Sequence, residues 1–254
     1  MCWDLEWPED LEGVVLARLN MLTVRDRQVL GSAAVVGEVF WTGALVAIER
    51  FNVDVPEHVG NLERDKLTWE ISRSIDRLVA LRFIQQRDSS LTNEPSWAFR
   101  SPLQWKVAST IVPEAARSRY HRIVEQWLRI HAGADSHDHL EDLARHAKLA
   151  GDAVRAAGYN RRAAQRALDA HDPRKSLGLL SEARALIPAD DRATRVELEV
   201  SLGDVQARLG EVEDALASYH VALHSAWQLR HQNVGADLLM RIGRVETSMG
   251  RYAD

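Results

Sequence analysis

Residues 202–222 read LGDVQARLGEVEDALASYHVA, and small or apolar residues recur along this run at helical spacing. Gly203 and Gly210 lie seven residues apart, and Ala215 and Tyr219 follow with a step of four between them. This spacing gives each of two helices one small, apolar face. Gly210 permits a tight turn between the helices, because glycine reaches backbone conformations that other residues avoid. The run therefore predicts a helical hairpin that packs against similar hairpins.

The same phrase begins again as IGRVETSMGRYAD at residues 242–254, and two weaker copies precede it. One copy is LARHAKLAGDAVRAAGYNRRAAQRAL at 143–168, with the turn at 150–152, and the other runs from Ser176 to Pro188. The pattern resembles the tetratricopeptide repeat, a helical hairpin of about 34 residues that stacks into a superhelix.

The 40-residue distance from Gly203 to Gly243 departs from this period and predicts a lengthened second helix or loop within 224–235. We expect residues 132–254 to form tetratricopeptide-like helical repeats, with the last repeat truncated and the chain a part of a longer protein. An ordinary helical bundle is the alternative.

Composition indicates a soluble, cytoplasmic protein. Hydrophobic residues make up 46% and charged residues 27% of the chain, and no run approaches the length of a membrane span. A single cysteine, Cys2, excludes an internal disulfide framework, and the acidic start MCWDLEWPED is unlike a signal peptide. The formal net charge is -5, with +2 over residues 11–131 and -3 over 132–254. Neither part has the basic character expected of a nucleic-acid binder, so we expect no nucleic acid and no membrane as partner.

Residues 11–131 follow another plan, preceded by a tail at 1–10. Apolar periodicity predicts helices over 11–22, 24–36, 40–51, 67–81, 104–112 and 114–132. Phe83–Gln86 and Trp97–Arg100 read as two short strands around a polar turn, and Pro56 and Gly60 mark a loop. Three helices followed by a β-hairpin are the order of a winged-helix domain. The expected fold class is therefore mainly all-α, a winged helix with a small hairpin followed by a helical solenoid. We expect Trp69, Trp105 and Trp127 to lie in the core.

Several runs, spread over nearly the whole chain from about Leu11 to Asp254, resemble the region that follows the nucleotide-binding core in bacterial STAND signalling ATPases. They include ARLNMLTVRDRQVLGSAAVVGEVFWTGAL at 17–45, IDRLVALRFIQQ at 75–86 and WAFRSPLQWKVASTIVP at 97–113. The family includes relatives of the maltose-regulon activator and cyclase- or kinase-linked regulators. The resemblance implies that the winged helix packs on a nucleotide-binding domain of the parent protein, and that the repeats sense a ligand or protein partner.

The resemblance does not extend to catalysis. The chain has no Gly-x-x-x-x-Gly-Lys-Ser/Thr phosphate-binding loop and no kinase motif. We therefore expect that the chain is not an enzyme and that it binds no cofactor by itself. ATP or ADP would bind only if a core is supplied elsewhere. Family members often have Phe-Arg-His where this chain has Phe99-Arg100-Ser101, and that histidine is expected to sense the nucleotide phosphate. Arg100 and Ser101 are the residues left for that role.

Other residues are candidates for binding. His139 and His146, with the acids around them, have the chemistry of metal ligands, but we expect solvated or capping roles and no metal. For the repeats, the expected partner is a protein or peptide. Its candidate contacts are Arg161, Arg162, Arg166, Gln206, Tyr219 and His220. The alternative is a free-standing winged-helix transcription regulator that binds DNA. Its candidate contacts are Lys66, Arg73, Arg77 and Arg82.

Overall fold

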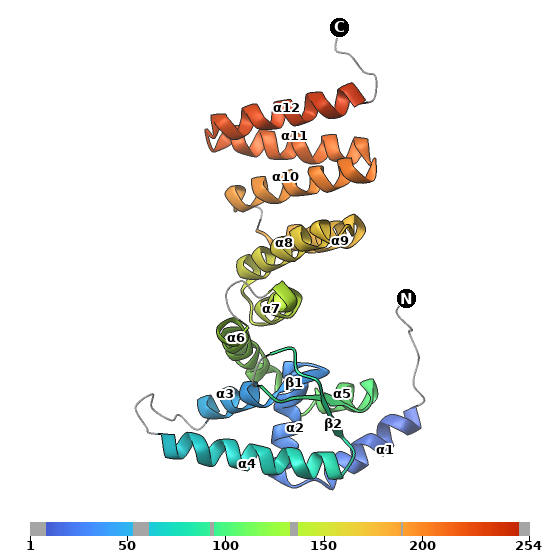
Figure 1. The fold of residues 1–254 in the computed structure, drawn as a ribbon, viewed down its shortest axis with the longest axis vertical. Coiled ribbons are helices and arrows are strands. Elements are labelled where there is room, and N and C mark those ends of the chain that lie inside the picture. Colours follow the sequence, from blue (N-terminus) through green and yellow to red (C-terminus); the bar gives the residue numbers. More distant parts are fainter. Residues whose placement is uncertain (1–8, 53–60, 92–93, 133–136, 189, 249–254) are drawn as a thin grey trace. The chain divides into compact units, whose positions relative to one another are not determined.

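The computed structural model describes residues 9–52, 61–91, 94–132, 137–188 and 190–248. Within these residues the chain is mostly helical, with twelve α-helices, one short 3-10 helix and one three-stranded antiparallel sheet (Figure 1). The chain divides into two compact units, residues 1–135 and 136–254. Among the described helices, none combines the length and the apolar character needed to cross a bilayer.

The described part of unit 1 holds six helices around an apolar core. Thr23 begins the second helix, because its hydroxyl accepts a hydrogen bond from the Asp26 backbone N–H. Phe40, Ile71 and Leu78 are almost fully buried between the helices. The helices are α1 (Glu9–Asn20), α2 (Val24–Val36), α3 (Thr42–Asn52), α4 (Asn61–Ala80), α5 (Pro102–Ala108) and α6 (Glu114–His131).

The sheet of unit 1 contains a strand that the sequence prediction missed. Strands β1 (Val39–Trp41), β2 (Ile84–Arg87) and β3 (Ser96–Phe99) lie in the order β1-β3-β2. The prediction of one helix over 40–51 was wrong at its start, because Phe40 pairs with Trp97 of β3 and its ring lies 5.8 Å from that of Phe99. The apolar pair Phe40-Trp41 is compatible with either element, and pairing with β3 decides between them.

Two helix boundaries also differ from the prediction. Helix α4 begins at Asn61, six residues before the predicted start. Helix α5 lies at 102–108 instead of 104–112, because Ser101 caps it and Pro102 occupies its first turn. The loop predicted around Pro56 and Gly60 falls outside the described residues.

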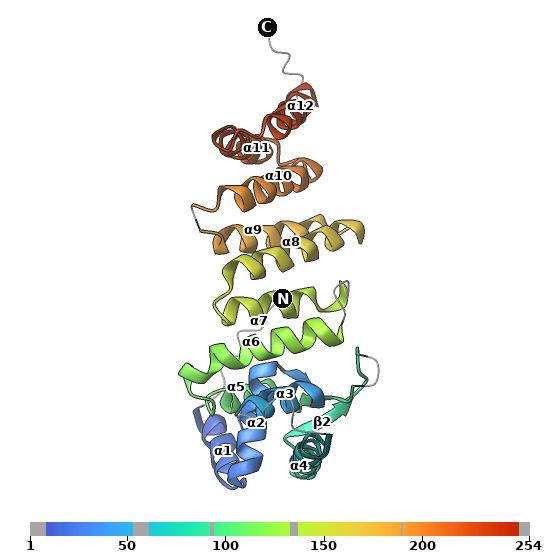
Figure 2. The same cartoon turned by 90° about the vertical axis from the view of Figure 1, so that its left-hand side faces the viewer.

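Over residues 137–188 and 190–248, unit 2 is a series of six α-helices, each packed on the next (Figures 1 and 2). Three of them begin with an aspartate whose carboxylate accepts a hydrogen bond from the backbone N–H three residues later. Gly210 has a φ of 78° and forms the turn after the fourth helix, as expected from the sequence. The helices are α7 (Leu140–Leu149), α8 (Ala153–Asp169), α9 (Pro173–Leu186), α10 (Arg192–Leu209), α11 (Val212–Gln228) and α12 (Gln232–Ser248).

Ion pairs between non-consecutive helices show that unit 2 has two layers. Arg161 of α8 pairs with Glu197 of α10 at 3.2 Å, and Asp204 of α10 pairs with Arg241 of α12. On the other side, Glu141 of α7 pairs with Lys175 of α9 at 2.7 Å. Helices α8, α10 and α12 therefore form one layer, and α7, α9 and α11 form the other.

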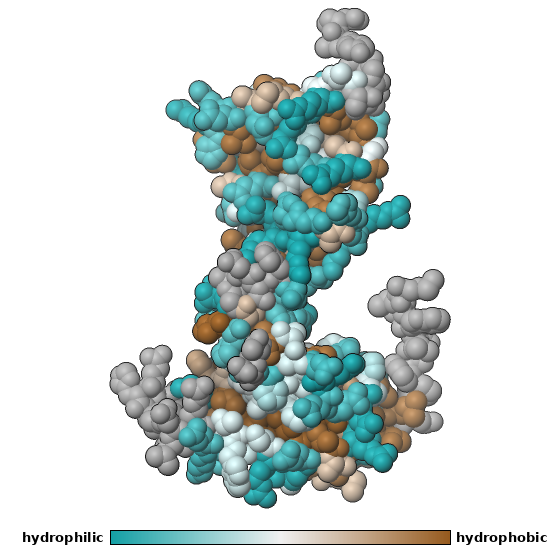
Figure 3. Space-filling view, viewed as in Figure 1, coloured by the Kyte–Doolittle hydropathy of each residue, from teal (hydrophilic) through white to brown (hydrophobic). Residues whose placement is uncertain are grey.

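Buried residues fill the space between these layers. One cluster joins α8, α9 and α10 around Leu180, Leu198 and Leu202, and a second joins α10, α11 and α12 around Tyr219 and Leu238. In the view of Figure 3, hydrophilic residues cover much of the visible surface of unit 2, and hydrophobic residues show between the helices. Burial between neighbouring helices thus supplies the core of the unit.

Candidate functional site

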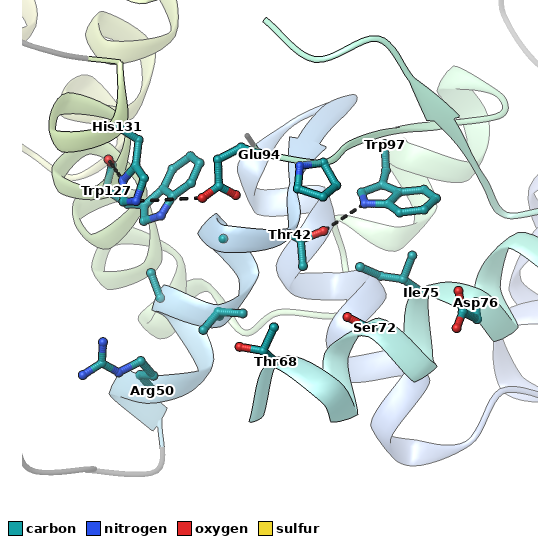
Figure 4. Close-up of a pocket in the computed structure, with 14 residues that line it drawn as sticks. Thr42, Arg50, Thr68, Ser72, Ile75, Asp76, Glu94, Trp97, Trp127 and His131 are labelled. Atoms are coloured by element: carbon teal, nitrogen blue, oxygen red, sulfur yellow. Dashed lines mark hydrogen bonds and ion pairs between the residues drawn. The ribbon is translucent and has the colours of Figure 1, made fainter. Parts of the chain in front are cut away.

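Unit 1 contains a cavity of about 370 Å³, which lies within the size range of small-molecule sites. Helices α3 and α4, the end of α6 and the segment entering β3 form its wall (Figure 4). The wall combines indole rings, hydroxyl groups and charged side chains. The lining residues include Thr42, Ser72, Glu94, Trp97, Trp127 and His131.

Trp127 and His131 form one end of this wall. Their rings stack at 4.4 Å between centroids, and His131 Nδ1 donates a hydrogen bond of 2.8 Å to the Trp127 carbonyl oxygen. Because a carbonyl only accepts, this bond places a proton on Nδ1 and leaves Nε2 facing Glu94 Oε1 at 3.9 Å. Gly43 allows this arrangement, because an added Cβ there would lie 2.7 Å from Glu94 Oε2 and 2.8 Å from Trp127 Cζ2.

Trp97 and Thr42 form the opposite wall and join β3 to the start of α3. The Trp97 indole N–H donates to Thr42 Oγ1 at 3.0 Å, and the Thr42 backbone N–H donates to the Pro95 carbonyl at 3.1 Å. The two contacts fix the Trp97 ring over the cavity (Figure 4).

No pattern in the sequence predicted this cavity. Three tryptophans were expected in the core, and Trp127 is indeed buried at 7% exposure, but Trp69 is 58% exposed and lies under the guanidinium of Arg73. Trp105 donates its indole N–H to the Ala34 carbonyl. The only sequence signals for the cavity are Gly43 and the carboxylate of Glu94, and neither shows from spacing alone that α3 and α6 meet there.

In unit 2 the predicted partner contacts do not form one surface. Tyr219 is 2% exposed, its ring covers Gly203 and its hydroxyl donates to Asp204 at 2.8 Å, so it is a packing residue. The Gln206 amide shares a hydrogen bond of 2.7 Å with the Ser218 hydroxyl, between α10 and α11. His220 is exposed on α11, in the other layer from α8.

The three candidate arginines of α8 are spread over its surface. Arg161 reaches Glu197 of α10, whereas Arg166 pairs with Asp138 and lines a second cavity of about 360 Å³ beside α7 and α9. Arg162 is half-buried. The structure therefore brings only Arg161 of the predicted set to the surface shared by α8, α10 and α12.

The residues that join this surface were not predicted from the sequence. Asp204 accepts from both Tyr219 and Arg241, and Arg241 also pairs with Asp237 one turn earlier at 2.7 Å. Burial and the hydrogen bond to Asp204 raise the pKa of Tyr219, and the neighbouring carboxylates raise the pKa of Arg241 against the effect of its burial. This network holds three helices together.

Glu199 is a second buried acid in unit 2. Its side chain is 4% exposed, and the guanidinium of Arg184 lies 3.7 Å from its carboxylate, beyond hydrogen-bond distance. Burial raises the pKa of the Glu199 carboxyl above its ordinary value of 4.5, and Arg184 and Arg195 only partly oppose this rise.

Arg77, a candidate DNA contact, forms an ion pair with Asp26 inside unit 1. Its guanidinium donates to both carboxylate oxygens of Asp26, at 2.6 and 2.9 Å, and to the hydroxyl of Ser74 at 3.1 Å. Burial opposes ionisation of Asp26, but the hydrogen bonds from Arg77, Thr23 and Ser74 outweigh it and lower the Asp26 pKa. Arg77 thus joins α4 to α2.

The other candidate DNA contacts lie on α4 or just after it. Lys66 is exposed, Arg73 packs on Trp69, and Arg82 lies in a turn with a φ of 59° after α4. Lys66, Arg73 and Arg77 are spaced seven and four residues apart on α4, which places them on one face of the helix.

The two candidate nucleotide-sensing residues follow β3. Ser101 caps α5, because its hydroxyl accepts from the Gln104 backbone N–H at 3.1 Å. Arg100 is exposed, and its backbone N–H donates to the Phe83 carbonyl.

The histidine-rich start of α7 lies partly outside the described residues. His139 and His146 are buried at 4% and 0% exposure, and His139 Nδ1 lies 3.7 Å from Asp142. Burial opposes ionisation of Asp142, but His139 and Arg145 outweigh it and lower its pKa. Among the described side chains, no group of three or more His, Cys, Asp or Glu has the arrangement of a metal site.

Comparison with known proteins adds no family. No protein-family model and no curated protein matches the chain.

Proposed function

We propose that this chain is a non-catalytic regulatory part of a STAND-type signalling protein and that its second unit binds a protein partner in the cytoplasm. In this proposal unit 1 is a winged-helix-like domain that contacts a nucleotide-binding domain, and unit 2 is a tetratricopeptide-like scaffold. ATP or ADP would belong to that other domain.

The two-layered packing of unit 2 is the observation that carries the proposal. Consecutive helices alternate between the layers, so α8, α10 and α12 share one surface although each is separated from the next by another helix. Arrays of helical hairpins present such continuous surfaces to partners. We call this surface the α8–α10–α12 face and define it by Arg161, Glu197, Asp204, Met240 and Arg241.

The chemistry of this face suits a peptide or helix that carries charges of both signs around an apolar residue. Acidic and basic side chains alternate across it, and Met240 is 57% exposed, one turn after Asp237. Methionine is adaptable and polarizable, and it is common at surfaces that bind peptides. The charged groups would select the partner, and Met240 would supply apolar contact.

Unit 1 supports its part of the proposal by the order of its elements. Helices α2, α3 and α4 precede the β2–β3 hairpin, which is the order expected for a winged helix. The alternative of a DNA-binding regulator has less support, because Arg77 is held by Asp26 and Arg73 packs on Trp69.

Peptide display on the full chain tests the proposal. Peptides selected against the wild-type protein should bind Met240→Glu at least about tenfold more weakly, because the substitution places a charge in the apolar contact. Leu239→Glu is the matched control, since Leu239 lies on the same helix with 53% exposure. Two results would contradict a partner site on the α8–α10–α12 face. In the first, the peptides bind both variants with equal affinity; in the second, only Leu239→Glu weakens their binding.

A further inference from the structure

Glu94 stands out among the residues that line the cavity of unit 1. Its side chain is 22% exposed, and within the described part of the chain no group donates a hydrogen bond to its carboxylate. His131 Nε2 lies 3.9 Å from Glu94 Oε1, which is too far for a hydrogen bond. A carboxylate that has lost most of its water is stabilised by a donor or a cation. The cavity therefore offers an unsatisfied anionic group to a ligand.

The walls next to Glu94 are aromatic and apolar. Trp97 and Trp127 come from different elements and both line the cavity, together with Val46, Ala47 and Ile75 (Figure 4). Indole rings attract cations electrostatically, because the faces of the rings carry negative charge. Aliphatic side chains beside them would cover a short apolar body of a ligand.

Two hydroxyl groups supply further acceptors for N–H groups. Thr42 Oγ1 accepts one hydrogen bond from Trp97 and keeps a second lone pair. Ser72 of α4 lines the same cavity. An ammonium group has three donors, and the acceptors in the cavity lining include the Glu94 carboxylate and these hydroxyls.

The charge of the cavity also favours a cation. Asp76 adds a second carboxylate, and the basic side chains among the described residues that line it are Arg50 and His131. In Figure 4 the guanidinium of Arg50 is directed away from Glu94. We propose that this cavity binds a small organic cation, a protonated amine with a short apolar body, whose ammonium group contacts Glu94 and whose body lies between Trp97 and Trp127.

Three probes of similar size and different charge test the proposal on the full chain. Titration calorimetry should show saturable binding of n-butylammonium, and binding of 1-butanol and of butyrate should each be at least about tenfold weaker, because only the cation can pair with Glu94. Equal binding of butyrate, or the absence of binding by n-butylammonium, would overturn the proposal. This comparison uses only the wild-type protein, so it does not depend on how a variant folds.

Substitutions then locate the site. Glu94→Gln keeps the shape of the side chain and removes its charge, so n-butylammonium should bind about tenfold more weakly. Asp88→Asn is the control, because Asp88 is an exposed acid of unit 1 that does not line the cavity. This variant should bind n-butylammonium with the same affinity as the wild type.

Gly43→Ala probes the same site by shape. The added Cβ would lie 2.7 Å from Glu94 Oε2, so it should displace the carboxylate and weaken binding. Unchanged affinity in both Glu94→Gln and Gly43→Ala, each with wild-type thermal unfolding, would place the amine elsewhere and overturn the proposal.

Discussion

The ring of Tyr219 occupies the space in which a side chain at Gly203 would lie. A Cβ on Gly203 would lie 2.5 Å from Tyr219 Cε1 and 2.6 Å from Cδ1, so α10 and α11 approach closely only because residue 203 is glycine. The contact is fixed at the other end of the ring, where the Tyr219 hydroxyl donates to Asp204.

We therefore expect Gly203→Ala to destabilise unit 2. Overpacking of a buried contact costs about 1–3 kcal/mol, which exceeds the gain of up to about 1 kcal/mol from replacing glycine in a helix. Thermal unfolding measures the net loss. Gly178→Ala in α9 is the matched control, since an added Cβ there meets no described atom within 4 Å, and it should stabilise slightly. If both variants were stabilised, the close approach at Gly203 would not constrain the packing.

The internal pair of Arg77 leads to a second prediction. Arg77→Ala leaves the buried Asp26 carboxylate without its main partner and should lower the stability of unit 1 by about 2 kcal/mol, less than for a fully buried pair because Arg77 is partly exposed. Arg73→Ala, one turn earlier on α4, removes only the contact with Trp69 and should cost less than about 1 kcal/mol. Chemical denaturation of the two variants measures both losses, and equal losses would contradict a special role for Arg77.

Asp26 also predicts an acid-dependent stability of unit 1. The folded protein lowers the pKa of Asp26 below its ordinary value of 3.8. The Asp26–Arg77 pair therefore contributes fully to stability above pH 3.8, and this contribution is lost as the pH falls through the pKa of Asp26 in the folded protein. Asp26→Asn should thus be less stable than the wild type at pH 7, with a difference that shrinks below pH 3.8. Thermal unfolding across this range checks it. A difference independent of pH would mean that the charge of Asp26 does not matter.

Glu199 predicts the opposite dependence in unit 2. Burial raises the pKa of Glu199 above its ordinary value of 4.5, because the neutral carboxyl is favoured in the folded protein. The contribution of Glu199 to stability is therefore present below pH 4.5 and is lost as the pH rises through its pKa in the folded protein. Glu199→Gln removes the charge and should be at least as stable as the wild type at pH 7, with a smaller advantage at pH 4.5. Thermal unfolding at the two pH values measures this. A large loss at pH 7 would show that the pairing with Arg184 outweighs the cost of burial.

Local signals predicted much of the helical architecture. Gly210, with its left-handed conformation, and the small residues around Ala215 were sufficient to predict the α10–α11 hairpin, and the unusual distance from Gly203 to Gly243 agrees with long helices, since α11 alone has 17 residues. These features depend on residues close in sequence, whose periodicity is visible directly.

Features that depend on distant contacts were missed. Strand β1 exists because Phe40 meets Trp97, and the exposure of Trp69 depends on which side of α4 faces α2 and α3. The cavity requires Gly43, Glu94 and Trp127 to meet from three separate segments. Likewise, the α8–α10–α12 face follows from the pairing of Asp204 with Arg241, 37 residues apart. Contacts between residues far apart in the sequence are not visible in its periodicity. Candidate residues for a binding surface could therefore be predicted, but not which of them lie together.

Amide hydrogen exchange of the full chain, with and without a display-selected peptide, tests the central claim most directly. A partner on the α8–α10–α12 face should slow exchange in α8, α10 and α12 much more than in α7, α9 and α11, because bound helices open less often. Slower exchange confined to α7, α9 and α11, or to unit 1, would contradict the proposal that this face of unit 2 is the partner site.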